Sequence, residues 1–166
     1  MLYGSPEHGG GELGVMAVAY PRWVRIELVR EEAVAYRPKI GDPKDLAAFV
    51  APLIEREARE VFVVVCLDTK HRVNAVNRVG LGGIDHVSAG PREVFQAALL
   101  ANSAAIALAH NHPSGDPTPS GQDIALTHRL VDAGGVLGVA VVDHLVIGDR
   151  SHMSIRKLHP DLGWGE

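Results

Sequence analysis

The sequence predicts one domain of the α/β or α+β class, with a mixed central β-sheet and helices on both faces. Residues 61–67 are continuously apolar and rich in β-branched side chains, which is typical of a strand buried on both faces. Apolar residues at helical spacing follow Asp42, Gly90 and Ser120, and each of these positions favours the start of a helix. Strand-like and helical segments do not alternate strictly, which favours a mixed sheet.

Composition limits the classes of protein that the chain can belong to. Its 166 residues are 46% apolar and 22% charged, which is typical of a globular domain with a substantial core. The formal charge of −4 and the absence of a dense Lys/Arg run argue against a nucleic-acid partner, although a local basic face stays open. No segment resembles a signal peptide or a membrane span, so we expect a cytoplasmic protein with no membrane partner.

The order of the expected elements divides the chain into three parts. The sequence predicts a flexible Gly-rich arm at residues 1–20, the folded domain at 21–158, and a peripheral C-terminal tail at 159–166. Strands are expected at 23–36 (one or two), 61–67, 73–79, 84–88, 104–109, 136–147 (one or two) and 153–155. Helices are expected over about 43–54, 90–102 and 120–133.

Local signals set the ends of these helices. Asp42 is the expected N-cap of the first helix, with Pro43 at its first position. Pro52 falls inside the apolar pattern and is expected to kink or interrupt that helix, because proline lacks the backbone N–H. The pair Gly134-Gly135 is expected to end the third helix.

The stretch 110–123 contains the residues best suited to chemistry. His110, His112 and Asp123 form a plausible metal set of two imidazoles and one carboxylate, which leaves a position open for water, as a catalytic zinc site requires. Prolines stiffen the intervening loop and can bring the first turn of the next helix back towards the histidines. Ser120 and Asp123 also have a structural interpretation as an N-cap with an acidic residue three positions on, and capping is compatible with metal binding. Cys66, the single cysteine, is interpreted as a buried structural thiol.

The same residues carry a resemblance to a known family. The run 110–115, His-Asn-His-Pro-Ser-Gly, continues as Pro119-Ser120-x-x-Asp123 and resembles the JAMM (MPN⁺, JAB) metalloprotease motif, and more narrowly the RadC family. The resemblance covers about residues 25–157. Further segments that agree with it are 59–64, 91–95 and 143–148. It implies a single JAMM/MPN-like domain with a three-layer architecture like that of cytidine deaminases.

The resemblance also implies roles for individual residues. His110, His112 and Asp123 would bind Zn²⁺, and Glu60 would act as general base towards the zinc-bound water. Ser120 would help to hold that water or the oxyanion. For Glu60 the competing interpretation is a solvated charge after a helix, with Glu55 and Glu57 as alternatives for the base.

The implied activity is that of a zinc metallopeptidase that hydrolyses an amide or isopeptide bond. Its substrate would be a peptide or protein, with ubiquitin-like conjugates as one class. The alternative is a RadC-like protein associated with DNA repair that binds or processes nucleic acid. Asn111, Ser114 and Asp143 are candidates for supporting the metal ligands, with turn or capping roles as equal alternatives. The sequence leaves the oligomeric state open, a homodimer included.

Overall fold

The computed structural model describes residues 37–81 and 89–165. The elements follow in the order α1 (Pro43–Ile54), β1 (Val61–Leu67), β2 (Val73–Leu81), α2 (Pro91–Leu100), β3 (Ala105–Asn111), α3 (Gly121–Leu137), β4 (Ala140–Gly148), β5 (Ser151–Ser154) and α4 (Ile155–Leu158). The strands form one sheet in the order β2-β1-β3-β4-β5. The expected mixed α/β class is confirmed.

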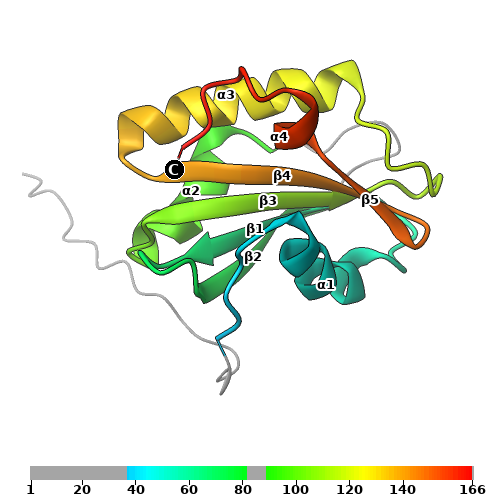
Figure 1. Cartoon of the computed structure of the whole chain (residues 1–166), viewed down its shortest axis with the longest axis horizontal. Helices are drawn as coiled ribbons and strands as arrows, with labels where there is room; N and C mark the ends of the chain where they lie inside the picture. The colour runs from blue at the N-terminus through cyan, green and yellow to red at the C-terminus, as the bar shows by residue number, and fades with distance from the viewer. Residues whose placement is uncertain (1–36, 82–88, 166) are drawn as a thin grey trace, which may run out of the picture.

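The sheet separates two apolar layers, with α1 on one face and α2 and α3 on the other (Figure 1). Strand β1 is buried along its whole length because it contributes to both layers. Val61, Val63 and Val65 pack with α1, whereas Phe62 and Val64 pack with α2 and α3. This alternation explains why the sequence of β1 is apolar throughout.

Strand directions bring the ends of three strands together. β1 pairs antiparallel with both β2 and β3, β4 pairs parallel with β3, and β5 pairs antiparallel with β4. α3 connects the parallel pair, so its N-terminus lies beyond the C-terminal ends of β3 and β4. Because β1 runs opposite to β3, its first residue lies at this same edge of the sheet.

Helix α1 differs from the expectation at Pro52. Asp42 caps the helix as predicted, since its carboxylate accepts hydrogen bonds from the backbone N–H groups of Lys44 and Asp45 at 2.7 and 2.9 Å. The helix then continues through Pro52 to Ile54, so the expected interruption was wrong. Pro52 lies in the last turn, where only one helical hydrogen bond is lost before the helix ends.

Helix α3 is longer than its sequence suggested. It continues through Gly134 and Gly135 to Leu137, and Gly138 ends it with φ of +68°. The expectation that Gly134-Gly135 ends the helix was therefore wrong, and β4 begins at Ala140. Gly134 serves close packing instead, because a Cβ atom there would lie 2.5 Å from the carbonyl oxygen of Val139.

The C-terminal elements differ in their bounds. β5 begins at Ser151, and Ile155 starts α4 rather than ending a strand. Trp164 packs against the apolar layer beneath α2 and α3, and its indole N–H donates to the carbonyl oxygen of His159 at 2.7 Å. The expected arm at 1–20 and the strands at 23–36 and 84–88 lie outside the described residues. Within the described ranges, no helix has the length and apolarity needed to cross a membrane.

Candidate metal centre

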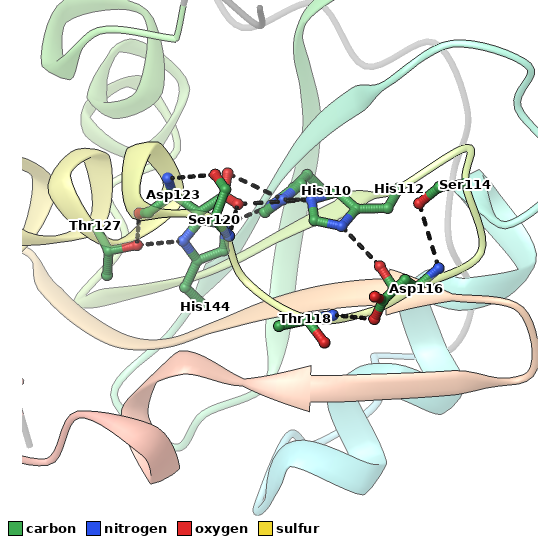
Figure 2. Close-up of polar contacts among 9 residues, drawn as sticks. All are labelled: His110, His112, Ser114, Asp116, Thr118, Ser120, Asp123, Thr127 and His144. Carbon is green, nitrogen blue, oxygen red and sulfur yellow. Dashed lines mark hydrogen bonds and ion pairs between the residues drawn. The ribbon is translucent and has the colours of Figure 1, made fainter.

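Strand β3, the loop after it and helix α3 each supply one of the three predicted ligand side chains. His110 lies near the end of β3, His112 follows directly after the strand, and Asp123 lies in the first turn of α3. Figure 2 shows the three side chains converging on one point. In residues 37–81 and 89–165, they are the one group of three potential ligand side chains whose donor atoms all lie within 4.8 Å of one another.

The distances among these atoms fit a tetrahedral metal ion. The Nε2 atoms of His110 and His112 are 3.1 Å apart. The carboxylate oxygens of Asp123 lie 3.3 Å from Nε2 of His110 and 3.6 Å from Nε2 of His112. Bonds of 2.0–2.1 Å at tetrahedral angles would separate ligand atoms by about 3.3 Å. The donor set of two imidazoles and one carboxylate therefore fits Zn²⁺ and leaves a fourth position open.

Charge and burial favour a cation at this point. Burial by itself would raise the pKa of Asp123, but hydrogen bonding and charge from His110, together with hydrogen bonds to Ser120, hold that pKa well below its usual range. The carboxylate is therefore ionised. The His110 side chain is 1% exposed, whereas those of His112 and Asp123 are 19% and 12% exposed, so the centre opens to solvent on their side.

The loop after β3 holds His112 by backbone contacts. Nδ1 of His112 lies 2.8 Å from the carbonyl oxygen of Asp116, which can only accept, so Nδ1 carries the hydrogen and Nε2 presents a lone pair to the centre. The backbone N–H of His112 donates to the carbonyl of Ile147 on β4 at 2.9 Å. The same loop packs closely against Gly148 of β4, because a Cβ atom at that position would collide with the carbonyl oxygen of Gly115.

Ser120 has the capping geometry that the sequence predicted. Its hydroxyl oxygen accepts from the N–H of Asp123 at 3.2 Å, and its own N–H donates to the Asp123 carboxylate at 2.6 Å. The second contact holds the carboxylate in place while its other oxygen faces His110. As an acceptor, the Ser120 hydroxyl keeps its hydrogen for another partner.

Glu60 lies immediately before β1, at the edge of the sheet that carries the centre. Phe62 pairs with His110 across β1 and β3, and the two rings stack at 6.1 Å with an angle of 7°. Glu60 precedes the paired residues of β1, so its relation to the centre follows only by extension: alternation continued from Phe62 would set it on the same face, and the antiparallel register would set it opposite His112. Glu57 instead forms an ion pair with Arg78 at 2.8 Å.

The three expected supporting residues have separate structural roles. Asn111 accepts from the N–H of Val61 at 2.8 Å and donates to the carbonyls of Glu57 and Arg59 at 3.2 and 3.1 Å, so it holds the segment that contains Glu60. Ser114 accepts from the N–H of Asp116 at 3.4 Å, as in a turn.

Asp143 joins β4 to β5. It accepts from the Ser154 hydroxyl at 2.8 Å and from the N–H of His144 at 2.7 Å, and burial raises its pKa. Cys66 is also buried, which raises the pKa of its thiol to about 11, so a nucleophilic role is disfavoured.

Two polar residues behind His110 were not predicted from the sequence. His144 is fully buried on β4, with Nε2 at 2.9 Å from Nδ1 of His110. Its Nδ1 lies 2.6 Å from the hydroxyl of Thr127, which is also fully buried. The available signals were a polar pair, Asp143-His144, inside an apolar strand, and a threonine one helical turn after Asp123.

Fold and site together define a mixed α/β domain with a candidate His-His-Asp metal centre. The family model of the RadC-like JAB domain matches residues 40–160, and the chain belongs to this family. The resemblance inferred from the motif is thereby confirmed. A UPF0758 protein of Methanosarcina acetivorans is 38% identical over 151 residues, which cover 90% of this chain and 65% of the relative.

A UPF0758 protein of Moorella thermoacetica is 46% identical over 121 residues, covering 73% of this chain and 53% of the relative. One from Desulfitobacterium hafniense is 45% identical over a stretch of the same length, with the same coverage. The chain thus spans about half to two thirds of the length of these curated relatives.

Proposed function

We propose that this chain is a zinc-dependent hydrolase that cleaves an amide or isopeptide bond in a peptide or protein. The observation that carries the proposal is the convergence of two Nε2 atoms and one carboxylate at spacings that suit tetrahedral Zn²⁺. Three protein ligands leave the fourth position open, which is typical of catalytic rather than structural zinc. Membership in the JAB family supports hydrolysis as the reaction class.

In this proposal His110, His112 and Asp123 hold the metal. Zinc bound there would supply Lewis acidity, lowering the pKa of water and polarising a substrate carbonyl. The greater exposure of His112 and Asp123 leaves their side of the centre accessible to a peptide. His110 is buried against Phe62 and serves as the fixed inner ligand.

Glu60 and Ser120 take the remaining roles. Glu60 accepts a proton from the attacking water and passes it to the leaving amine; this role is supported by its place in the chain directly before β1, whose first residue paired with β3, Phe62, lies opposite His110. The Ser120 hydroxyl accepts one hydrogen bond from the helix and has its own hydrogen available to stabilise the negative charge that develops on the substrate oxygen. Asn111 holds the backbone on both sides of Glu60.

The test combines metal content with hydrolysis in the same samples. Zinc-reconstituted wild-type chain is expected to hold about one zinc per chain by mass spectrometry of the metal. His110→Ala and Asp123→Ala should lose the metal. Glu60→Gln should keep the metal and lose at least about 10²-fold in the cleavage rate of quenched fluorescent peptide and Lys-isopeptide substrates.

Glu57→Gln is the matched control, because Glu57 lies in the same segment but pairs with Arg78 on the protein surface. It should retain both metal and activity. A folded wild-type chain that takes up no zinc would refute the metal centre. A zinc-loaded chain that cleaves none of these substrates, or a Glu60→Gln variant with full activity, would refute the catalytic assignment.

A further inference from the structure

A chain of hydrogen bonds runs from His110 back to the helix that carries Asp123. Nδ1 of His110 contacts Nε2 of His144 at 2.9 Å, and Nδ1 of His144 contacts the Thr127 hydroxyl at 2.6 Å. The same hydroxyl lies 2.6 Å from the backbone carbonyl oxygen of Asp123. Figure 2 shows these groups in sequence behind the metal ligands. All the links are buried.

The direction of each hydrogen bond follows from the group at the end of the chain, the backbone carbonyl of Asp123. A carbonyl oxygen can only accept, so the single hydroxyl hydrogen of Thr127 points to Asp123. Thr127 therefore accepts from His144, whose Nδ1 must carry a hydrogen. The His144 ring is fully buried between a hydroxyl and a second imidazole, where an imidazolium charge would be costly, so the ring is neutral and its Nε2 is an acceptor. His110 consequently donates through Nδ1.

This direction leaves the Nε2 lone pair of His110 facing the centre. The Asp116 carbonyl fixes His112 in the same tautomer, so two lone pairs and one carboxylate meet with Nε2 atoms 3.1 Å apart. Such a group of acceptors requires a cation, either a metal ion or a second proton on one imidazole. The hydrogen bonds behind the ligands thus prepare His110 for coordination through Nε2.

We propose that His144 and Thr127 are positioning residues, which set the tautomer and ring orientation of His110 and join the ligands of β3 to that of α3. This inference rests on the proposed metal-dependent function, and neither residue touches metal or substrate. An apolar core would not need a histidine at position 144, since burying an imidazole costs free energy unless its nitrogens are hydrogen-bonded. Both nitrogens of His144 have partners here, and its ring also meets Phe62 edge-on at 5.3 Å.

Thr127→Val is the sharpest test, because it keeps the shape of the side chain and removes the hydroxyl. His144 then loses its acceptor at Nδ1, and its hydrogen is expected to move to Nε2, which faces His110. His110 becomes protonated at Nε2 and must rearrange to bind metal. Zinc affinity, measured by competition with a chromophoric chelator, should fall about 10- to 100-fold.

Two further variants separate positioning from packing. Thr127→Ser restores the hydroxyl and should retain wild-type zinc affinity. Ser103→Ala likewise removes a hydroxyl, but one that lies just before the start of β3, at the opposite end of the strand from the metal centre. This hydroxyl donates to the side-chain oxygen of Asn74 at 3.2 Å, and its removal should leave zinc affinity unchanged. Substitution of Co²⁺ provides a spectroscopic readout, since a displaced His110 would alter the d–d bands of Thr127→Val but not those of Ser103→Ala.

A measurement on the wild-type chain keeps the proposal testable even if a variant misfolds. Long-range ¹H–¹⁵N correlation spectra of the chelator-treated chain should show a hydrogen on Nδ1 of both His110 and His144, with Nε2 of His144 unprotonated. A zinc-binding wild-type chain whose His110 carries no hydrogen on Nδ1, or a folded Thr127→Val variant with unchanged zinc affinity, would overturn the positioning role. Failure to bind zinc with the expected tautomers present would overturn the proposed function while supporting the tautomer assignment.

Discussion

Asn111 links the candidate base to the metal ligands at the scale of a single residue. Asn111 lies between His110 and His112 in the sequence. Its side chain makes three hydrogen bonds to the backbone of the segment that leads into β1. The amide uses both its acceptor and its donors, so no other side chain of similar size could replace it without leaving backbone groups unpaired. The position of Glu60 therefore depends on Asn111.

We expect Asn111→Ala to lower the free energy of unfolding by about 1–3 kcal/mol, because a buried N–H of Val61 would lose its partner. Zinc content should be retained while peptide hydrolysis falls, because Glu60 is no longer held. Urea unfolding, metal analysis and the peptide assay would measure the three effects. Asn74→Ala, which removes a half-buried amide bonded to the Ala101 carbonyl, is the control. Equal losses of activity in both variants would contradict this role for Asn111.

The residues that the sequence revealed are those whose relation is local. His110, His112 and Asp123 lie within one short stretch of the sequence, so their spacing alone predicted a metal set. Glu60 came only through the resemblance, because it is distant from the ligands in the sequence and only the pairing of β1 with β3 brings its segment to their edge of the sheet. His144 and Thr127 went unnoticed for the same reason. Their contacts arise from the register of β4 and from the packing of α3 on it.

At the scale of elements, α3 shows how packing overrides a local signal. Gly134 and Gly135 are both weak helix formers, yet the helix continues through them because its buried face rests on the sheet. At Gly134 a Cβ atom would meet the Val139 carbonyl at 2.5 Å and Phe95 at 3.3 Å. At Gly135 it would meet nothing within 4 Å. The two adjacent glycines therefore have different structural requirements.

This difference predicts opposite effects of the same substitution. Gly135→Ala should stabilise the protein by roughly 0.5–1 kcal/mol, since alanine is the better helix former and has space. Gly134→Ala should destabilise it, because the added methyl collides with backbone. Thermal and urea unfolding of the two variants, measured side by side, provide the comparison. Destabilisation by both would indicate that the helix ends at these glycines in solution.

Element types were more predictable than their ends. Apolar runs and caps identified β1, α1 and the start of α3, because those signals are encoded within a few residues. The short helix α4 was missed, since one turn carries too little periodicity to detect. Its cap could have been noticed: the Ser154 hydroxyl accepts from the N–H of Lys157 at 3.1 Å.

At the scale of the whole molecule, the site depends on topology. The sequence predicted layers on both faces of a mixed sheet, but it could not order the strands as β2-β1-β3-β4-β5. That order places the start of β1 beside the end of β3, and the parallel β3-α3-β4 connection returns the first turn of α3 to the same edge. The ligands thus belong to two layers, the sheet and the helix above it (Figure 1).

A metal ion held between these layers should stabilise the entire domain. Binding to the folded chain alone contributes about 2.7 kcal/mol at a free zinc concentration 100 times the Kd. For a domain of this size, that gain corresponds to an increase in Tm of about 5–11 °C. Calorimetry of the chelator-treated chain with and without zinc measures the shift.

Asp123→Ala and His112→Ala should abolish the shift, since each removes one ligand and leaves the fold intact. Glu60→Gln should preserve it, because the base lies outside the ligand set. The shift therefore reports on the metal centre independently of any substrate. An equal shift in Asp123→Ala would mean that zinc binds elsewhere, and the link between β3 and α3 would then have to come from the protein's own hydrogen bonds.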